Sequence, residues 1–406
     1  MITVLLCACM CASLIAVRCS ALSVTDAKTQ AEKTLSYRAA LAGQPDVQSF
    51  FSGYCAAHVN DSDCEWYIIG SRAVGTFSYS SYLSALENYQ GEMTATNIQK
   101  CIIAAAAAGE QTSLGGRDAS SIGAAGLMSY IFGLLMLDAD ASGSAAQRIN
   151  IINYLLSCEK SDGGWAIGNT KYSDTDVTSM ALCALAPYKN TALCSGACSS
   201  ALSFLLGARH KNGTYASYGK ENAESTAQVI IAMCSYGYDP GDITDSLMSF
   251  SRGDGSFCHE AGGSASGMAA YQAYLALCAY VLYKENGTAL YRMSGTVPDI
   301  SSSVSSSSNV TSVTGSTQKN QTDVNKSDTS DINNTISDEN GTGSGKNSYE
   351  YSDVRSGKDA EKASGTDMCD TYVKRVICSL YVSAAGLLIC IFRETILSRM
   401  KRFRVS

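Results

Sequence analysis

The stretch Ser161-Asp162-Gly163-Gly164-Trp165, followed shortly by Asp174-Thr175-Asp176-Val177-Thr178-Ser179-Met180-Ala181-Leu182, decides the fold of this chain. A glycine-rich turn that carries an aromatic residue leads into a run of small and apolar residues, which is typical of a buried helix. Weaker copies follow at residues 211–215 with 222–233, and at residues 253–257 with 266–277. A unit that repeats every roughly 40 to 50 residues predicts an array of helical hairpins.

Each repeat is expected to place one helix before the glycine turn and one after it. The helices before the turns are predicted over residues 149–158, 201–208 and 245–250. The helices after the turns are rich in alanine, serine and threonine, and such small side chains let neighbouring helices approach closely on both flanks. That property suits an inner ring of helices around a central cavity.

Two earlier segments, residues 65–70 and 126–137, are interpreted as inner helices whose glycine turns have eroded. With them the chain contains roughly six hairpins, which is enough to close a double ring of helices. We therefore predict an all-α fold, an (α/α)6 toroid, over residues 22–293.

The two ends of this region have different compositions. Residues 2–17 are apolar and are followed by small residues at positions 19–21, which predicts a signal peptide over residues 1–21, with an uncleaved membrane anchor as the alternative. Residues 294–368 are mostly Ser, Thr, Asn, Asp, Gly and Lys, and they cannot bury enough apolar surface to offset the entropy of ordering. They are predicted to form a disordered, flexible stalk.

An uncharged apolar run over residues 376–392 is preceded by Lys374 and Arg375 and followed by a basic tail. The run is near the lower limit for crossing a hydrocarbon core, and we predict one transmembrane helix over residues 369–392. The basic residues 393–406 then lie in the cytoplasm, and the main domain lies outside the cell. The prediction is a single-pass protein of the cell membrane; the alternative is an ordinary buried helix.

The charge of the chain bears on which partners it can bind, and its cysteine content bears on which disulfide bonds it can form. The formal net charge is −7 and the folded region carries no basic patch, which argues against nucleic acid as a partner. Several of the 17 cysteines fall inside apolar helical runs, where a thiol acts as a small hydrophobic group. Two pairs, Cys55 with Cys64 and Cys194 with Cys198, are candidates for disulfide bonds, which export permits.

Residues 162–165, 173–178, 180–188 and 222–228 resemble the prenyltransferase and squalene-cyclase repeat. The resemblance covers most of residues 50–290, and the chain looks most like exported bacterial α/α-toroid proteins with terpenoid cyclase-like repeats. Distant relatives of those proteins include cobalamin carriers, terpene cyclases, β-subunits of protein prenyltransferases and the thioester domain of complement-like proteins. Because one toroid hosts several chemistries, the resemblance implies a fold more strongly than an activity.

One activity that the resemblance implies is terpene cyclisation. Class II cyclases carry an Asp-x-Asp-Asp motif, which aligns here with Asp174-Thr175-Asp176-Val177 and implies that Asp176 is the acid that protonates an alkene. Val177 replaces the last aspartate of the motif, and so strong a proton donor needs neighbouring groups to tune it. The alternative is structural, because Ser173 and Asp176 have the spacing of a capping box at a helix start.

Other chemistries of the superfamily lack their residues here. Protein prenylation needs a zinc ion, and the adjacent Cys258 and His259 do not have the spacing of that site, so no metal site is predicted. Thioester formation needs a cysteine before Gly109-Glu110-Gln111, where this chain has alanine. Cobalamin carriers hold their ligand between the toroid and a second domain, so cobalamin would need a partner protein; no cofactor is predicted.

The remaining function to consider is ligand binding without catalysis. Alignment of the predicted inner helices by their apolar runs places Asp176 level with Glu224 and, one turn further along, Gln228 level with Gln272. A buried amide needs a partner, and a concave cavity with a few polar groups is typical of a binding site. Alternatively, the amides bridge helices and the aromatic residues brace the turns. The predicted ligand-binding residues, with the aromatic ones at the rim, are Trp165, Tyr215, Glu224, Gln228, Phe257 and Gln272.

Three functions remain open on the sequence. The first is a surface-displayed module that binds a small molecule, polymer or partner protein in the central cavity without catalysis. The second is a terpene cyclase- or prenyltransferase-like enzyme that uses Asp176 as its acid, with Asp174 beside it. The third is a structural or adhesive surface protein. A deep, sealed aromatic cavity favours the enzyme, a shallow polar mouth favours the binder, and a filled centre favours the structural protein.

Overall fold

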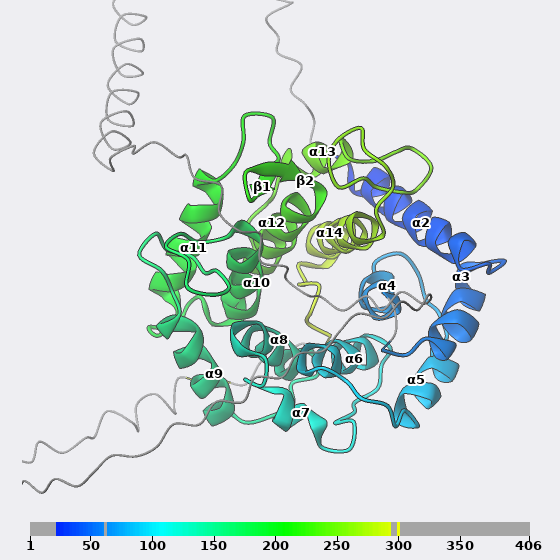
Figure 1. Ribbon diagram of the computed structural model, residues 1–406, viewed down its shortest axis with the longest axis horizontal. Coiled ribbons are helices and arrows are strands. Elements are labelled where there is room, and N and C mark those ends of the chain that lie inside the picture. The colour runs from blue at the N-terminus through cyan, green and yellow to red at the C-terminus, as the bar shows by residue number, and fades with distance from the viewer. Residues whose placement is uncertain (1–21, 61–62, 294–298, 301–406) are drawn as a thin grey trace, which may run out of the picture. The chain divides into compact units, whose positions relative to one another are not determined.

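The computed structural model describes residues 22–60, 63–293 and 299–300. These residues are mostly helical, which confirms the coarse prediction of an all-α class (Figure 1). The predicted signal peptide, transmembrane helix and basic tail lie outside the described residues, as does nearly all of the predicted stalk. Among the helices of the described part, none combines the length and the apolar character that a membrane span requires.

Six of the described helices form a closed succession. They are α4 (Cys64–Ser71), α6 (Ala95–Ala107), α8 (Gly126–Ala139), α10 (Thr175–Leu185), α12 (Ala223–Tyr236) and α14 (Gly267–Asn286). Each packs against the next in this order, and α14 packs against α4 as well as α12 (Figure 1). We call these six the inner helices.

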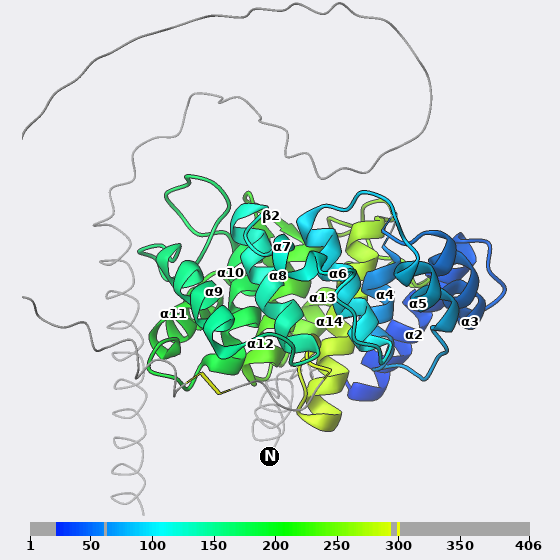
Figure 2. The ribbon, with the colours of Figure 1, turned by 90° about the horizontal axis from the view of Figure 1, so that it is seen from below.

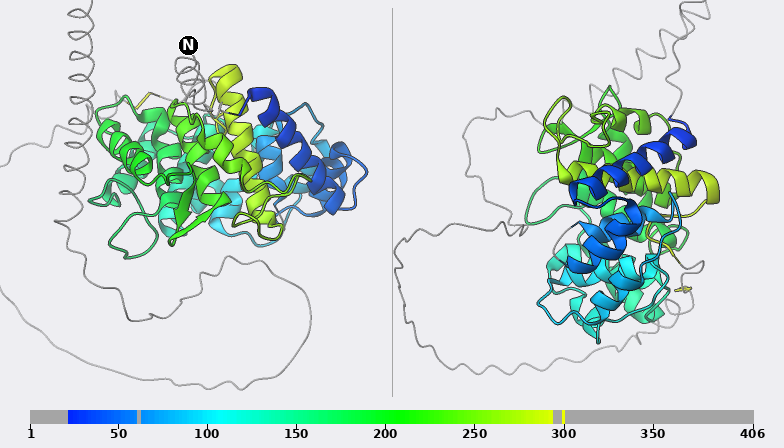
Figure 3. Two further views of the ribbon diagram at one scale, coloured as in Figure 1. Left: turned by 90° about the horizontal axis from the view of Figure 1, so that it is seen from above. Right: turned by 90° about the vertical axis from the view of Figure 1, so that its right-hand side faces the viewer.

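A second set of helices flanks the inner ones. It consists of α2 (Val24–Leu41), α3 (Val47–Ser49), α5 (Ser80–Glu87), α7 (Arg117–Ser121), α9 (Ala145–Ser157), α11 (Ser195–Gly207) and α13 (Ile243–Met248). Helix α2 packs on α14 (Figure 3), α7 on α6, α9 on α8, α11 on α10 and α13 on α12. A π-helical segment, η1 (Phe50–Cys55), contacts both α4 and α5, and a 3-10 turn, η2 (Ala186–Tyr188), extends α10.

The predicted positions of most of these helices are confirmed. The helices expected over residues 149–158, 201–208 and 245–250 correspond to α9, α11 and α13, and those expected over residues 65–70 and 126–137 correspond to α4 and α8. Helix α6 was not predicted as an inner helix. Its sequence is dominated by a run of alanines, and Gly91 before it is not followed by an aromatic residue as the glycines of the repeat turns are.

The glycine turn of the first clear repeat is held by its aromatic residue. The backbone N–H of Trp165 donates to Oγ1 of Thr178 at 2.9 Å, and the indole Nε1 donates to the carbonyl of Leu155 at 2.7 Å. Gly163 adopts a left-handed φ of 86°, and a Cβ at this position would lie 2.9 Å from the Cβ of Ser200. The turn therefore ties the outer helix α9 to the inner helix α10.

The same hydrogen bond recurs in the next repeat. The backbone N–H of Tyr215 donates to Oγ1 of Thr226 at 3.0 Å. Thr178 and Thr226 are each the fourth residue of their helices, α10 and α12. The repeat seen in the sequence is thus a repeated turn-to-helix hydrogen bond as well as a repeated apolar pattern.

A short β-hairpin departs from the predicted all-α fold, as do two isolated β-bridges, Ser251 with Phe257 and Cys258 with Ala265. Strands β1 (Tyr215–Ser217) and β2 (Lys220–Asn222) pair in antiparallel fashion just before α12 (Figure 1; β2 is also labelled in Figure 2). Gly219 supplies a left-handed φ of 79° in the two-residue loop between them. The hydroxyl of Ser217 donates to Oδ2 of Asp174 at 2.8 Å, so the hairpin also links this repeat to the previous one.

Candidate functional site

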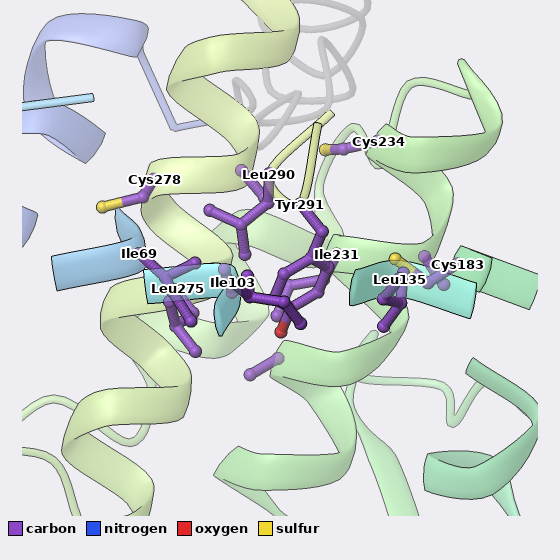
Figure 4. Packing of buried hydrophobic residues seen from close by; sticks show 14 of the residues in the cluster. Ile69, Ile103, Leu135, Cys183, Ile231, Cys234, Leu275, Cys278, Leu290 and Tyr291 are labelled. Atoms are coloured by element: carbon purple, nitrogen blue, oxygen red, sulfur yellow. The ribbon is translucent and has the colours of Figure 1, made fainter. Parts of the chain in front are cut away.

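The inward faces of the inner helices form layers of side chains. One layer, which we call the apolar layer, lies near the middle of the helices. It takes one residue from each helix: Ile69, Ile103, Leu135, Cys183, Ile231 and Leu275. Each of the six is 5% exposed or less. Figure 4 shows them arranged around a common centre.

The centre of the apolar layer is occupied by the segment after α14, residues 288–293, which we call the strap. Leu290 and Tyr291 of the strap are 0% and 7% exposed, and both point into the centre (Figure 4). Burial raises the pKa of the Tyr291 hydroxyl well above its ordinary value. The hollow middle expected from the sequence is therefore filled at this level.

The strap is anchored at the C-terminal ends of the inner helices. Nη2 of Arg72, just after α4, donates to the carbonyls of Ala289, Leu290 and Arg292 at 2.7, 3.1 and 3.3 Å. The backbone N–H of Met293 donates to the carbonyl of Ala139, the last residue of α8, at 3.1 Å. The strap therefore covers the C-terminal end of the ring of inner helices.

Beside the strap lies a small cavity of about 20 Å³, which is room for roughly one water molecule. Its lining comes from the strap and from the C-terminal ends of α8, α10 and α12, and includes Asp138, Cys183, Ser235 and Tyr291. A cavity of this size cannot hold a terpene-sized substrate.

A second layer lies one turn toward the helix N-termini, three residues before the apolar layer on the same faces. This mouth layer consists of Trp66, Lys100, Phe132, Met180, Gln228 and Gln272. Lys100 and Gln228 are 6% and 9% exposed, and the other four are partly exposed. The mouth layer therefore combines amide, ammonium, thioether and aromatic groups at the end of the inner helices opposite the strap.

The aromatic side of the mouth layer crosses the centre. The ring centroids of Trp66 and Phe132 are 5.9 Å apart, although α6 stands between their helices. Tyr271 stacks beside Trp66 with a centroid distance of 6.0 Å and an interplanar angle of 12°. The ammonium of Lys100 lies 5.9 Å from the Trp66 centroid and 3.1 Å from Oε2 of the buried Glu65. These rings cover part of the apolar layer.

The amide side consists of two glutamines on neighbouring helices. Nε2 of Gln228 donates to Oε1 of Gln272 at 3.0 Å, so the two amides bridge α12 and α14. This bridge is what the sequence analysis gave as the alternative to ligand binding. Each side chain keeps one further polar atom, the Gln228 Oε1 and the Gln272 Nε2. Among the described residues, the bond between the two amides is the one hydrogen bond that these side chains make, and neither of these atoms takes part in it.

Asp174 and Asp176 lie at the start of α10. The carboxylate of Asp174 caps the helix by accepting from the backbone N–H groups of Asp176 and Val177 at 2.9 and 3.0 Å. The predicted capping box of Ser173 with Asp176 is wrong. Ser173 instead donates its backbone N–H to Asp162, so Asp174 takes the cap position.

Asp176 is the second residue of α10, as Glu224 is of α12, which confirms the predicted register between them. Burial, followed by the nearby Asp174, raises the pKa of Asp176 to about 7, and the Ser225 hydroxyl opposes this rise. Oδ1 of Asp176 is buried without a hydrogen bond to any described residue. Asp176 is thus a carboxyl that is easily protonated near neutral pH.

Glu224 is 6% exposed and bonds to a histidine that the sequence placed in a loop. Nδ1 of His259 lies 2.7 Å from Oε2 of Glu224, while the backbone N–H of Ala223 donates to the His259 carbonyl. The neighbouring Cys258 points away, with its thiol directed at the carbonyl of Phe250 at 3.1 Å. Cys258 and His259 therefore serve separate contacts.

The predicted aromatic rim is wrong. Trp165, Tyr215 and Phe257 are each 0% exposed, because they pack beneath their turns as the bracing alternative proposed. The aromatic residues at the mouth are instead Trp66, Phe132 and Tyr271. The sequence held a signal for Trp66 and Phe132, because both precede an apolar-layer residue by three positions, as Gln228 and Gln272 do.

The structure also reports on the proposed cysteine pairs and on metals. Within the described chain Cys194 and Cys198 form no disulfide, and Cys198 directs its thiol at the carbonyl of Leu185. The predicted disulfide between Cys55 and Cys64 does not form either, because Cys55 is a free thiol; both residues are buried, and the thiol of Cys64 lies within hydrogen-bonding reach of Cys55. No group of three or more His, Cys, Asp or Glu side chains among residues 22–60, 63–293 and 299–300 could hold a metal ion.

Comparison with known proteins finds no matching family model, no matching curated protein and no matching solved structure.

Proposed function

We propose that this chain is a surface-displayed binding module that holds a small polar ligand at the mouth layer, without catalysis. The observation that carries the proposal is the bridged pair Gln228 and Gln272, which leaves one acceptor atom and one donor atom unused in the same layer as the partly exposed rings of Trp66 and Phe132. Paired polar groups beside an apolar surface are what orient a ligand in protein binding sites.

The fold proposed for this module is an (α/α)6 toroid of the terpenoid cyclase-like kind. Support comes from the closed succession of inner helices and from the pairing of most of them with an outer helix. The Trp165–Thr178 and Tyr215–Thr226 hydrogen bonds add support, because equivalent positions in two sequence repeats form the same contact.

Binding at the mouth is preferred to terpene cyclisation on grounds of space. The pKa of Asp176, raised to about 7, suits an acid, and this favours the enzyme. A cyclase, however, must enclose an apolar substrate, and the strap fills the apolar layer where that substrate would lie. The filled centre also keeps a structural or adhesive role as the second candidate.

Display at the cell surface rests on the sequence of residues 1–21, 294–368 and 369–406. Proteolysis of intact cells tests it. A signal peptide and one membrane span predict that added protease releases the folded domain while the basic tail stays with the cell.

Tryptophan fluorescence offers a direct test of binding at the mouth. The chain contains two tryptophans; Trp165 is fully buried, whereas Trp66 is partly exposed in the mouth layer. A ligand at the mouth should change the emission of the full-length protein in detergent and protect it from acrylamide. The Trp66→Phe variant should lose this response, and Trp165→Phe should keep it. A response that depends on Trp165 instead would refute binding at the mouth.

A further inference from the structure

The geometry points to a neutral saccharide as the ligand, bound through a terminal sugar ring at the mouth layer. This inference rests on the proposed binding function and specifies its ligand class. A sugar ring carries an apolar face of C–H groups and an edge of hydroxyls that both donate and accept. The mouth layer presents the matching surfaces on neighbouring helices.

The apolar face has its counterpart in Trp66 and Phe132. Their rings meet over the apolar layer at 5.9 Å, and Tyr271 extends the aromatic surface by stacking on Trp66. Trp66 and Phe132 are partly exposed, so a ring of C–H groups can pack on them.

The hydroxyl edge has its counterpart in the amides. After the bond between them, Gln228 offers Oε1 as an acceptor and Gln272 offers Nε2 as a donor. Two adjacent sugar hydroxyls can satisfy both atoms at once, because each hydroxyl donates and accepts.

The charges around the mouth favour a neutral ligand. Lys100 lies 3.1 Å from Glu65, and Glu224 lies 2.7 Å from His259. An anionic ligand would have to compete with Glu65 for Lys100. A cationic ligand would have to approach Trp66 beside the ammonium of Lys100, which already lies 5.9 Å from the ring. A polyhydroxylated neutral ring avoids both costs.

The strap sets how the saccharide enters. Leu290 and Tyr291 fill the apolar layer, and Arg72 anchors the strap at the opposite end. A polymer therefore cannot thread through the inner helices, and only a ring that approaches from the mouth can contact the amides. This limits recognition to a chain end or a free monosaccharide.

The test uses the full-length protein in detergent and follows Trp66 emission during titration with neutral monosaccharides and linear oligosaccharides. A cyclic oligosaccharide, which has no terminal ring, is titrated in parallel. We expect saturable binding of one or more of the sugars with free ends and none of the cyclic one. Gln272→Leu should weaken binding by about tenfold, because it removes a hydrogen-bond donor to the ligand.

Gln111→Leu is the matched control. Gln111 follows α6 at the strap end, where its Nε2 donates to the carbonyl of Asp140, so this substitution should leave sugar binding unchanged. Equal binding of the cyclic and linear sugars would overturn recognition of a terminal ring. A fragment library screened in the same assay separates the two proposals. Fragments that bind through Trp66 without any saccharide doing so overturn the sugar assignment alone, whereas no response to either set overturns both.

Discussion

Trp66 on α4 and Phe132 on α8 place their rings 5.9 Å apart, although α6 lies between their helices. This contact shows that side chains from non-adjacent inner helices meet above the apolar layer. The strap reaches the same layer from the other end through Leu290 and Tyr291. Side chains therefore cover the core fully at the strap end and partly at the mouth, and different residues form the two ends.

Tyr291→Ala should destabilise the domain strongly. The side chain is 7% exposed and fills the centre, and truncation of large buried aromatic side chains typically costs about 3–5 kcal/mol because it leaves a cavity. Thermal unfolding of the full-length variant in detergent measures the effect. Tyr172→Ala, at a position 67% exposed, is the control and should change stability little. A loss no larger than that of the control would mean that the strap leaves the centre in solution.

Arg72→Met should loosen the strap. The substitution removes three donated hydrogen bonds to the carbonyls of residues 289, 290 and 292, but it also removes a buried cation, so the expected loss is about 1–3 kcal/mol. Denaturant unfolding should show that the double variant with Tyr291→Ala loses less stability than the sum of the two single losses. Strict additivity would indicate that Arg72 does not act through the strap.

Ile300 indicates that the folded domain extends past residue 293, where the sequence placed its boundary. The sequence placed residues 294–368 in the stalk, yet Ile300 is 1% exposed and packs with the core. A single isoleucine in a serine-rich segment carries no periodic signal, so composition alone could not assign it. The strap was missed for the same reason, since Leu290 and Tyr291 follow a helix end without any repeat pattern.

The parts of the fold that sequence could predict are those that repeat. Glycine turns with a following aromatic residue located α10, α12 and α14, and apolar runs located α4 and α8. The register between Gln228 and Gln272 followed from the same alignment and is confirmed by their positions as sixth residues of α12 and α14. Burial of the turn aromatics did not follow, because an aromatic residue in a turn can pack inward or outward with equal local chemistry.

Asp176→Asn tests the protonation state of the carboxyl. The pKa of Asp176 in the folded protein, raised to about 7 by burial and by Asp174, exceeds its ordinary value of 3.8. The stability contributed by the protonated form is therefore fully present below about pH 4 and is lost as the pH rises through about 7. Asparagine stays neutral, so the variant should match the wild type near pH 4 and exceed it at pH 8 by up to about 4 kcal/mol.

Denaturant unfolding of both proteins between pH 4 and pH 8 gives this difference directly, and other titrating groups, including Asp138, largely cancel in it. A difference that does not change with pH would show that the carboxyl is already ionised. Loss of sugar binding together with the gain in stability would assign Asp176 to the mouth as well.

Thr178→Val examines the hydrogen bond that defines the repeat. Oγ1 of Thr178 accepts from the N–H of Trp165 at 2.9 Å and donates to its carbonyl at 3.2 Å, and all of these groups are buried. Valine keeps the shape but leaves the Trp165 N–H unpaired, which should cost about 1–3 kcal/mol. Thr226→Val should cost a similar amount, because Thr226 accepts from the N–H of Tyr215 in the same way.

Thr170→Val, in the exposed loop before α10, is the matched control and should stay within about 0.5 kcal/mol of the wild type. Comparison of the two threonine variants tests the repeat more strictly than either variant alone. Thr178 and Thr226 occupy equivalent positions on the neighbouring helices α10 and α12, so their losses should be alike if the hydrogen bond defines the unit. A large loss at Thr178 with none at Thr226 would mean that the indole bond of Trp165 to Leu155, which Tyr215 cannot make, holds the first turn instead.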